Sequence, residues 1–191
     1  YVSRALAIAK EIGFASSGRF AWRIIVPVHN DGHYYSFVAR SIFSACPNCR
    51  EPDCKCERPW RKVLTPTGGH PRLTLYNLDA VRDTSSDPVV VVEGVFDALR
   101  LADRAVALLG STASVTQLSL LASLLRLGRR RVVICMDGDK AGRIGASKVA
   151  NGLLSYGIIP LMASLPTNTD PSSAPAEAVI DAIVHANPYL L

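Results

Sequence analysis

Short apolar runs alternate with helix-like segments through the second half of the chain, and this alternation constrains the fold more than any other feature. Strands are predicted at residues 89–92, 105–109, 131–136 and 158–165. Helices are predicted between them at residues 96–102, 116–127 and 141–154. Such alternation is typical of βαβ units, because each helix returns the chain so that the next strand runs parallel to the previous one. The sequence therefore predicts an α/β fold built on a parallel sheet.

The first half of the chain has a different pattern. Strand-like segments at 23–28 and 34–42 flank Asn30-Asp31-Gly32, a turn sequence that favours a β-hairpin. We expect a smaller mixed α+β basic subdomain here, and the polar stretch from Asp83 to Pro88 separates it from the parallel sheet. The predicted domains are 1–87, the basic subdomain with a four-cysteine loop at 46–56; 88–165, the parallel-sheet domain; and 166–191, an acidic turn and a helix.

The composition is that of a folded chain with an excess of positive charge. Of its 191 residues 49% are hydrophobic, which is enough for a well-filled core and excludes a disordered chain. No apolar run reaches the roughly 18 residues that a membrane span needs, so we expect no membrane partner. The formal net charge of +5 weakly favours a polyanionic partner.

Acidic residues follow two of the predicted strands. Glu93 comes directly after the first strand, and Asp137 and Asp139 come after the third. Because the carboxyl ends of parallel strands share one edge, these carboxylates are expected to converge there. Such a cluster repels itself unless a cation neutralises it, and oxygen ligands suit magnesium or manganese rather than zinc. Asp97 is a further candidate ligand, although acidic residues such as Asp97 and Asp139 also favour helix N-termini for purely structural reasons.

Four of the five cysteines are clustered in the first half of the chain. Cys46, Cys49, Cys54 and Cys56 have the spacing Cys-x2-Cys-x4-Cys-x-Cys, so that four thiolates within eleven residues make a compact tetrahedral zinc site. Free thiols, or a disulfide in an oxidising compartment, remain open as alternatives. We interpret the loop as a structural staple or a contact to a template.

The motifs around the acidic residues resemble those of a known family. They read Glu-Gly-Val-Phe-Asp at 93–97, Gly-Ser-Thr at 110–112 and Asp-Gly-Asp-Lys-Ala-Gly at 137–142. In order and spacing they resemble the Toprim domain, the metal-binding fold of DnaG-type primases, topoisomerases, OLD-type nucleases and recombination mediators. The form of each motif is most similar to the DnaG-type primases, including those of phages and primase-helicases.

The first half of the chain resembles the basic subdomain that precedes Toprim in those primases. The similar segments are Arg-Ile-Ile-Val-Pro-Val at 23–28, Ser-Phe-Val-Ala-Arg at 36–40 and Arg-Lys-Val-Leu-Thr-Pro at 61–66. Ala39 replaces a glycine and Val63 a tyrosine of the family pattern. The resemblance implies that Arg23, Arg40 and Lys62 contact template phosphates or an incoming triphosphate. Lys140 would neutralise the metal aspartates or meet a nucleotide phosphate, unless it is simply an exposed first-turn lysine.

The segment Leu-Pro-Thr-Asn-Thr-Asp-Pro at 165–171 resembles a primase segment that supplies a further acidic ligand. Asp170 matches that position. Ser172 stands where a second acid is often found, so one fewer metal contact is expected. The structural alternative is an Asp-Pro turn ahead of the last helix.

The resemblance implies an enzyme, a DNA primase that makes short RNA primers on single-stranded DNA by metal-dependent nucleotidyl transfer. Glu93, Asp137 and Asp139 would be catalytic and would bind Mg²⁺ or Mn²⁺ together with Asp97 and Asp170, while the four cysteines would bind Zn²⁺. The implied partners are the template, ribonucleoside triphosphates and a replicative helicase or helicase domain, in the cytoplasm of a bacterium or a phage-infected cell. Two alternatives stay open, a Toprim nuclease that hydrolyses DNA and a non-enzymatic recombination mediator with a zinc site.

Overall fold

The computed structural model describes residues 3–51, 54–56, 60–83, 87–128 and 130–190. The chain divides into two compact units, of which unit 1 comprises residues 1–28 and 34–70 and unit 2 comprises residues 29–33 and 71–191. Within the described residues, no helix has both the length and the apolar character that a membrane span needs. The division of the chain into domains 1–87, 88–165 and 166–191 stays a prediction.

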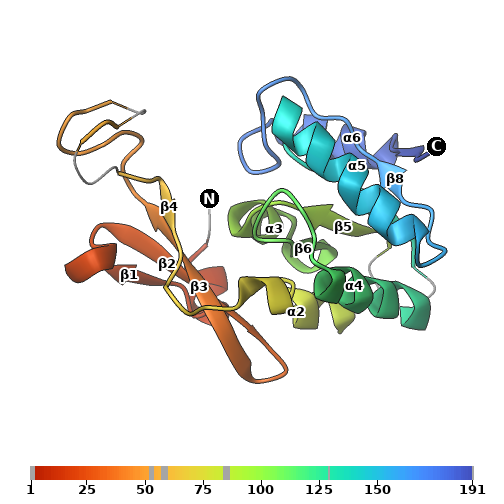
Figure 1. Ribbon diagram of the computed structural model, residues 1–191, viewed down its shortest axis with the longest axis horizontal. Coiled ribbons are helices and arrows are strands. Elements are labelled where there is room, and N and C mark those ends of the chain that lie inside the picture. Colours follow the sequence, from red (N-terminus) through yellow and green to blue (C-terminus); the bar gives the residue numbers. More distant parts are fainter. Residues whose placement is uncertain (1–2, 52–53, 57–59, 84–86, 129, 191) are drawn as a thin grey trace. The chain divides into compact units, whose positions relative to one another are not determined.

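Unit 1 is built on an antiparallel sheet with the strand order β1-β2-β3-β4 (Figure 1). Its elements are α1 (Arg4–Ala9), β1 (Gly13–Ala15), a 3₁₀ turn at Gly18–Phe20, β2 (Arg23–Asn30), β3 (His33–Ser41) and β4 (Val63–Leu64). Asp31 and Gly32 connect β2 to β3, and both have positive φ angles, 49° and 71°. Two such residues make the tight turn whose twist matches that of paired strands, so the predicted hairpin is confirmed.

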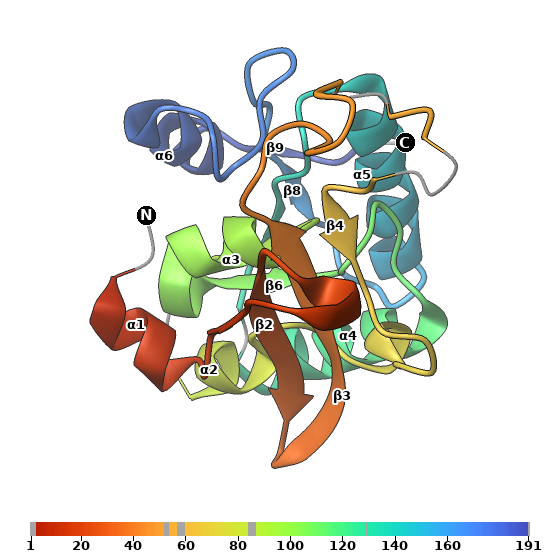
Figure 2. The ribbon, with the colours of Figure 1, turned by 90° about the vertical axis from the view of Figure 1, so that its left-hand side faces the viewer.

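Unit 2 contains the predicted α/β fold (Figures 1 and 2). Its elements are a 3₁₀ turn at Pro71–Leu73, α2 (Leu78–Arg82), β5 (Val89–Val92), α3 (Val95–Leu101), a 3₁₀ turn at Ala102–Arg104, β6 (Ala105–Ala107), α4 (Val115–Gly128), β7 (Val132–Ile134), α5 (Lys140–Leu154), β8 (Leu161–Met162), α6 (Ala176–Val184) and β9 (Asn187–Pro188). The sheet order is β6-β5-β7-β8-β9, in which β9 is antiparallel to β8 and the other neighbours are parallel. The fold class expected from the alternation is therefore confirmed.

The core of unit 2 lies between the sheet and helices α2, α4 and α5. Val91 of β5 pairs with Val106 on one side and with Ile134 on the other, and all three side chains are fully buried. Leu121 of α4 and Leu153 of α5 belong to the same buried cluster. The intervening strand residues, such as Val90 and Val92, are buried on the opposite face. Both faces of the sheet are thus covered, which explains why the strands read as continuous apolar runs.

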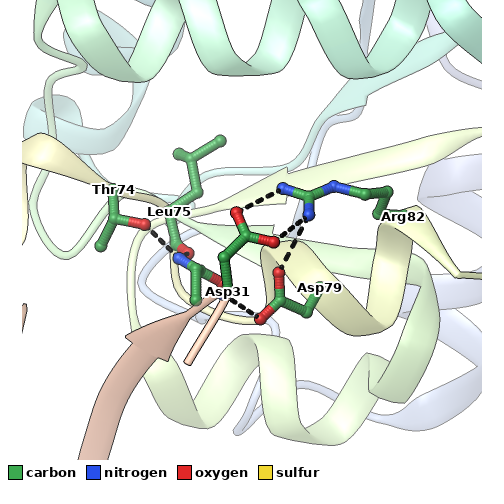
Figure 3. A network of polar contacts seen from close by, with 6 residues as sticks. Asp31, Thr74, Leu75, Asp79 and Arg82 are labelled. Carbon is green, nitrogen blue, oxygen red and sulfur yellow. Dashed lines mark hydrogen bonds and ion pairs between the residues drawn. The ribbon is translucent and has the colours of Figure 1, made fainter. Parts of the chain in front are cut away.

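The tip of the hairpin packs within unit 2 through a polar network (Figure 3). The Asn30 side-chain amide is buried and donates to Thr74 and to the carbonyl of Leu75. Next to it, Arg82 donates to the Asp31 carboxylate at 2.5 Å, and Asp79 accepts the N–H of Asp31 at 2.8 Å. Because the Asp31–Arg82 pair is exposed, the buried amide of Asn30 is the larger contribution to holding this tip in place.

Candidate functional site

Glu93 lies at the carboxyl end of β5, directly after four buried valines. One oxygen of its carboxylate, Oε1, is buried and has no hydrogen-bond partner. Burial raises the pKa of this carboxyl, and the charges of Asp139 and Asp97 raise it further, while a hydrogen bond from the Asp137 backbone acts in the opposite direction. A buried carboxylate oxygen without a donor is unfavourable unless a cation or a proton is supplied.

Asp137 lies at the equivalent end of the neighbouring strand, three residues beyond β7. Its Oδ1 is also buried without a hydrogen-bond partner. Burial raises the pKa of Asp137 to about 7, with further contributions from the charges of Glu93, Asp97, Asp170 and Asp139. The two strands therefore bring together two carboxylates that each have one buried oxygen without a hydrogen-bond partner, and the charge of Glu93 raises the pKa of Asp137.

The loop between β7 and α5 depends on two glycines. A Cβ atom on Gly142 would lie 2.2 Å from the carbonyl oxygen of Asp137, and one on Gly138 would lie 2.2 Å from that of Pro166. Gly138 instead approaches a distant loop closely, donating its N–H to Thr169 at 2.8 Å. These contacts place Asp170 beside the Asp137 loop, although 33 positions separate the two in the sequence.

Asp139 caps helix α5, since its Oδ1 accepts the N–H of Gly142 at 2.7 Å. Asp139 therefore has the purely structural role of a helix N-cap, and its role as a metal ligand stays a prediction. The role of Asp97 as a metal ligand stays a prediction as well, and this residue is 7% exposed. Its two oxygens accept the N–H of Gly94 at 3.0 Å and the N–H of Ser172 at 2.9 Å. Burial first, and then the charge of Asp170, raise the pKa of Asp97.

Asp170 opens a tight turn ahead of α6, as the Asp-Pro alternative predicts. Its Oδ1 accepts the hydroxyl of Ser172 at 2.6 Å and the N–H of Ser173 at 2.7 Å. Burial opposes ionisation, yet these hydrogen bonds prevail and hold the pKa of Asp170 below its ordinary value. Ser172 therefore contributes a hydroxyl to the turn where the family pattern has a second acid.

The donor set at this edge fits a divalent cation. The unpartnered oxygens of Glu93 and Asp137 are hard anionic ligands, and burial together with the charges of neighbouring carboxylates raises the pKa of both groups. Oxygen ligands of this kind suit Mg²⁺ or Mn²⁺.

The four cysteines of unit 1 form a second and tighter group. The sulfur atoms of Cys46, Cys49, Cys54 and Cys56 all lie within 4.8 Å of one another, close enough to bind one metal ion. A tetrahedral ion with zinc–sulfur bonds of about 2.3 Å requires sulfurs roughly 4 Å apart, so little movement is needed. Hydrogen bonds from the backbone of Trp60 and Cys56 lower the pKa of Cys54 to about 6, which favours a thiolate.

The backbone around Cys46 explains why these sulfurs meet. Cys46 is buried, its N–H donates to Glu51 at 3.1 Å, and its carbonyl accepts the N–H of Arg50 at 2.8 Å. Arg50 has a φ angle of 62°, so the chain reverses directly after Cys49. The knuckle geometry is therefore present in the polypeptide itself.

The basic candidates are placed differently from one another. Arg23 is 6% exposed, and its guanidinium donates to the carbonyls of Lys62 at 3.0 Å and Arg61 at 2.7 Å. These bonds give Arg23 a structural role between strands, and its contact with a phosphate stays a prediction. Arg40 lies in β3 and is half-buried, opposite Val63 of β4. Lys62, beside β4, and Lys140, at the start of α5, are exposed and accessible to a ligand.

One residue at this edge is absent from the candidates that the sequence supplies. Arg100, in α3, donates to the carbonyls of Pro171 at 2.8 Å and Ala174 at 2.6 Å. The pattern of the sequence gives no signal for it, because its two acceptors are backbone atoms more than 70 positions away.

Comparison with known proteins agrees with this geometry. Residues 90–174 match the family described as Toprim-like. A DNA primase of Thermotoga maritima is 30% identical over 173 residues, covering 86% of this chain and 28% of the relative. The other curated relatives are DNA primases of Haemophilus influenzae and Myxococcus xanthus. The chain spans less than a third of the length of each of these relatives.

Solved structures resemble almost the whole chain. The zinc-binding and RNA polymerase domains of the Aquifex aeolicus primase have a TM-score of 0.78 at 20% identity, covering 98% of this chain and 54% of that one. A DnaG catalytic core has a TM-score of 0.75 at 24% identity, covering 98% and 70%. At these identities the solved structures establish the fold, and the sequence similarity to the primase relatives supports the family. The chain therefore carries a Toprim domain within a core of the DnaG primase type.

Proposed function

We propose that this chain synthesises short RNA primers on single-stranded DNA, as the catalytic core of a DNA primase. The observation that carries the proposal is the acidic edge of the sheet. There Glu93 and Asp137 each have a buried oxygen without a hydrogen-bond partner, and the charge of Glu93 raises the pKa of Asp137. Phosphoryl transfer needs little covalent chemistry from a protein and depends on positioning and on charge stabilisation. A Toprim edge supplies the charge stabilisation, and a basic subdomain in the same chain supplies groups that position phosphates.

Glu93 and Asp137 hold the divalent cations in this proposal, and Asp139, Asp97 and Asp170 complete the site. When bound, Mg²⁺ or Mn²⁺ ions would activate the 3′-hydroxyl of one ribonucleotide and stabilise the pyrophosphate that leaves the next triphosphate. Both oxygens of Asp97 already accept backbone N–H groups, so Asp97 mainly holds the acidic turns in place. Lys140 is exposed beside the acidic loop, where an ammonium group can meet a triphosphate.

Arg40 and Lys62 bind template or nucleotide phosphates in this proposal. Arg40 lies in β3, and Lys62 directly precedes the strand that pairs with it, so both belong to one sheet of unit 1. Arg23 supports them from within the sheet through its bonds to the carbonyls of Arg61 and Lys62. A contact between Arg23 and a phosphate would require it to give up these bonds.

The four cysteines bind one Zn²⁺ ion, which fixes the loop between β3 and β4. Their mutual distances and the lowered pKa of Cys54 support zinc over free thiols. A replicative helicase, or a helicase domain, would bring the primase to its template, and the reaction would take place in the cytoplasm of a bacterium or a phage-infected cell. The relatives in the comparisons are primases, which does not favour a nuclease or a recombination mediator.

The decisive experiment is templated synthesis by the chain on single-stranded DNA, with labelled ribonucleoside triphosphates and either Mg²⁺ or Mn²⁺. Asp137→Ala should reduce primer synthesis by about 10³-fold, because it removes a buried anionic ligand from the reacting centre. The control is Glu177→Gln, which changes an exposed carboxylate at the start of α6 and should leave synthesis unchanged. Full synthesis by Asp137→Ala would refute the proposal.

The same preparation separates the alternative functions. A nuclease would degrade labelled DNA with Mg²⁺ and without nucleotides, whereas a primase would leave it intact. A recombination mediator would bind single-stranded DNA and make no RNA with any template. Either result with the wild-type chain would count against primer synthesis.

A further inference from the structure

Helix α3 presents two side chains of opposite charge, one turn apart, to the backbone around Asp170. Asp97 accepts the N–H of Ser172 at 2.9 Å. Arg100 donates to the carbonyl of Pro171 at 2.8 Å and to that of Ala174 at 2.6 Å. The Asp97 carboxylate therefore binds a backbone N–H of this turn, and the Arg100 guanidinium binds two of its carbonyls. One helix thus holds both donors and acceptors of the turn.

The two carbonyls need this donor. Pro171 and Ala174 are buried, and a buried carbonyl without a hydrogen bond is costly. The planar guanidinium of Arg100 reaches both acceptors with a single nitrogen, Nη1. The bonds are charge-assisted and therefore stronger than bonds between neutral groups. Substitution of Arg100 would free this turn without removing any carboxylate.

The turn that Arg100 holds carries a single carboxylate. Oδ1 of Asp170 accepts the hydroxyl of Ser172 at 2.6 Å and the N–H of Ser173 at 2.7 Å. Gly138 donates its N–H to the carbonyl of Thr169 at 2.8 Å, which places Asp170 beside the Asp137 loop, and the charge of Asp170 raises the pKa of both Asp97 and Asp137. Because Ser172 supplies a hydroxyl rather than a second acid, the position of Asp170 alone determines what the turn contributes to a cation.

We propose that Arg100 is a positioning residue that fixes the Asp170 carboxylate against the Glu93–Asp137 pair and thereby raises the affinity of this edge for divalent cations. Arg100 does not touch the cation or a nucleotide, and it acts only through the backbone of residues 171 and 174. The inference rests on the proposed function insofar as the acidic edge is taken to bind a cation. It adds a residue outside the acidic motifs whose loss should weaken that binding.

The experiment measures Mn²⁺ binding by the whole chain, from the loss of the free Mn²⁺ signal in electron paramagnetic resonance, together with the melting temperature. Arg100→Gln should weaken Mn²⁺ binding by about 10-fold, the size of effect typical of residues that orient metal ligands. Arg100→Lys should restore part of the affinity, since an ammonium group can still reach one of the two carbonyls. Arg104→Gln is the matched control, because Arg104 is exposed and follows α3 directly, and it should bind Mn²⁺ as the wild type does.

A second background distinguishes positioning from a general loss of stability. In the Asp170→Asn chain, Arg100→Gln should lower the melting temperature but should not weaken Mn²⁺ binding further, because the carboxylate through which Arg100 acts is gone. Ser172→Ala provides a milder variant that removes the hydroxyl bonding Asp170 and leaves the N–H of Ser172 on Asp97 in place, and it should weaken Mn²⁺ binding by about 2–3-fold.

The outcomes separate this inference from the proposed function. If Arg100→Gln binds Mn²⁺ as tightly as the wild type, or weakens binding equally in the Asp170→Asn background, the positioning role is refuted while primer synthesis is unaffected. If wild-type synthesis fails but Arg100→Gln still weakens Mn²⁺ binding, the positioning role stands and the proposed function falls. If the wild-type chain does not bind Mn²⁺ at all, both are refuted.

Discussion

The cysteine group of unit 1 and the acidic edge of unit 2 bring together candidate metal ligands by opposite means. The cysteines lie within eleven consecutive positions, and the reversal at Arg50 is enough to bring their sulfurs within 4.8 Å of one another. The carboxylates come from positions spread between Glu93 and Asp170, and only the strand order and the loop contacts bring them to one place.

The two groups also differ in how they tolerate their own charge. Thiols can stay protonated or donate to a neighbouring thiolate. Hydrogen bonds from the backbone of Trp60 and Cys56 lower the pKa of Cys54 to about 6, while the side-chain hydrogen bond with Cys54 raises the pKa of Cys56 to about 12. Glu93 and Asp137 have no such partner, so burial and repulsion are expressed as raised pKa values. The cysteines can thus lie close together without an ion, whereas the carboxylates are kept together against their repulsion by the surrounding fold.

The largest expected effect concerns zinc at the local group. Cys46→Ser should reduce bound zinc from one ion per chain to none, with an affinity loss of more than about 100-fold, because even residues that only support a ligand cost up to that much. Metal analysis of the purified protein measures this directly. Glu93→Gln, which changes the other site, should keep one zinc per chain.

Two results would contradict the zinc assignment. A wild-type chain that holds no zinc and shows no reactive thiols before reduction would favour disulfides. A Cys46→Ser variant that still holds one zinc per chain would show that the ion is bound elsewhere.

The next largest effect concerns a glycine that the acidic edge requires. Gly142→Ala should destabilise the fold by about 2–3 kcal/mol, since its Cβ would lie 2.2 Å from the Asp137 carbonyl oxygen and the loop must move. Gly110→Ala is the control, because nothing lies within 4 Å of its Cβ and its φ angle is not positive. Urea denaturation measures both, and equal midpoints for the two variants would contradict the close contact. Bound zinc should not change in either variant.

The smallest expected effect is an increase in stability on substitution of Asp137, a candidate site residue. The pKa of Asp137 is raised to about 7, so the folded chain binds a proton that the unfolded chain releases, and stability falls as the pH rises from about 4 to about 7. Asp137→Asn removes this penalty. Above about pH 7 and without divalent ions, the variant should be more stable by about 1 kcal/mol, or about 2–4 °C in melting temperature.

The advantage of Asp137→Asn should shrink as the pH falls toward 4 and vanish at about pH 3, where the wild-type carboxyl is protonated in the unfolded chain as well as in the folded one. Added Mg²⁺ should raise the melting temperature of the wild type and not that of the variant. A variant that melts at or below the wild type at every pH would show that the carboxylate is not strained by its surroundings.

Much of the fold could be predicted because its pattern is local. The four valines of β5 and the run before Asp137 are apolar at every position, which is typical of a strand buried on both faces. The predicted strand at 158–165 is wrong in length, since only Leu161 and Met162 form β8. Near the edge of the sheet, pairing with neighbours rather than apolar character decides where a strand ends. The antiparallel strand β9 was not predicted, because a two-residue strand has no periodicity.

The candidate site was predictable in its residue types and less so in their roles. Glu93 and Asp137 follow strands whose ends share an edge, and their convergence follows from that topology. The caps formed by Asp139 and Asp97, and the burial of Arg23, depend on which backbone groups lie nearby in space. No sequence pattern specifies those neighbours.

The sequence by itself determined the parallel α/β fold, the acidic strand ends and the four-cysteine knuckle, because each of these depends on residues close together in the chain. Only the tertiary structure decided how the turn of Asp170 is held, with Arg100 bonding its carbonyls, because those contacts join α3 to backbone more than 70 positions away. A hydrogen bond to a carbonyl leaves no trace in the identity of the accepting residue, since every residue has a carbonyl.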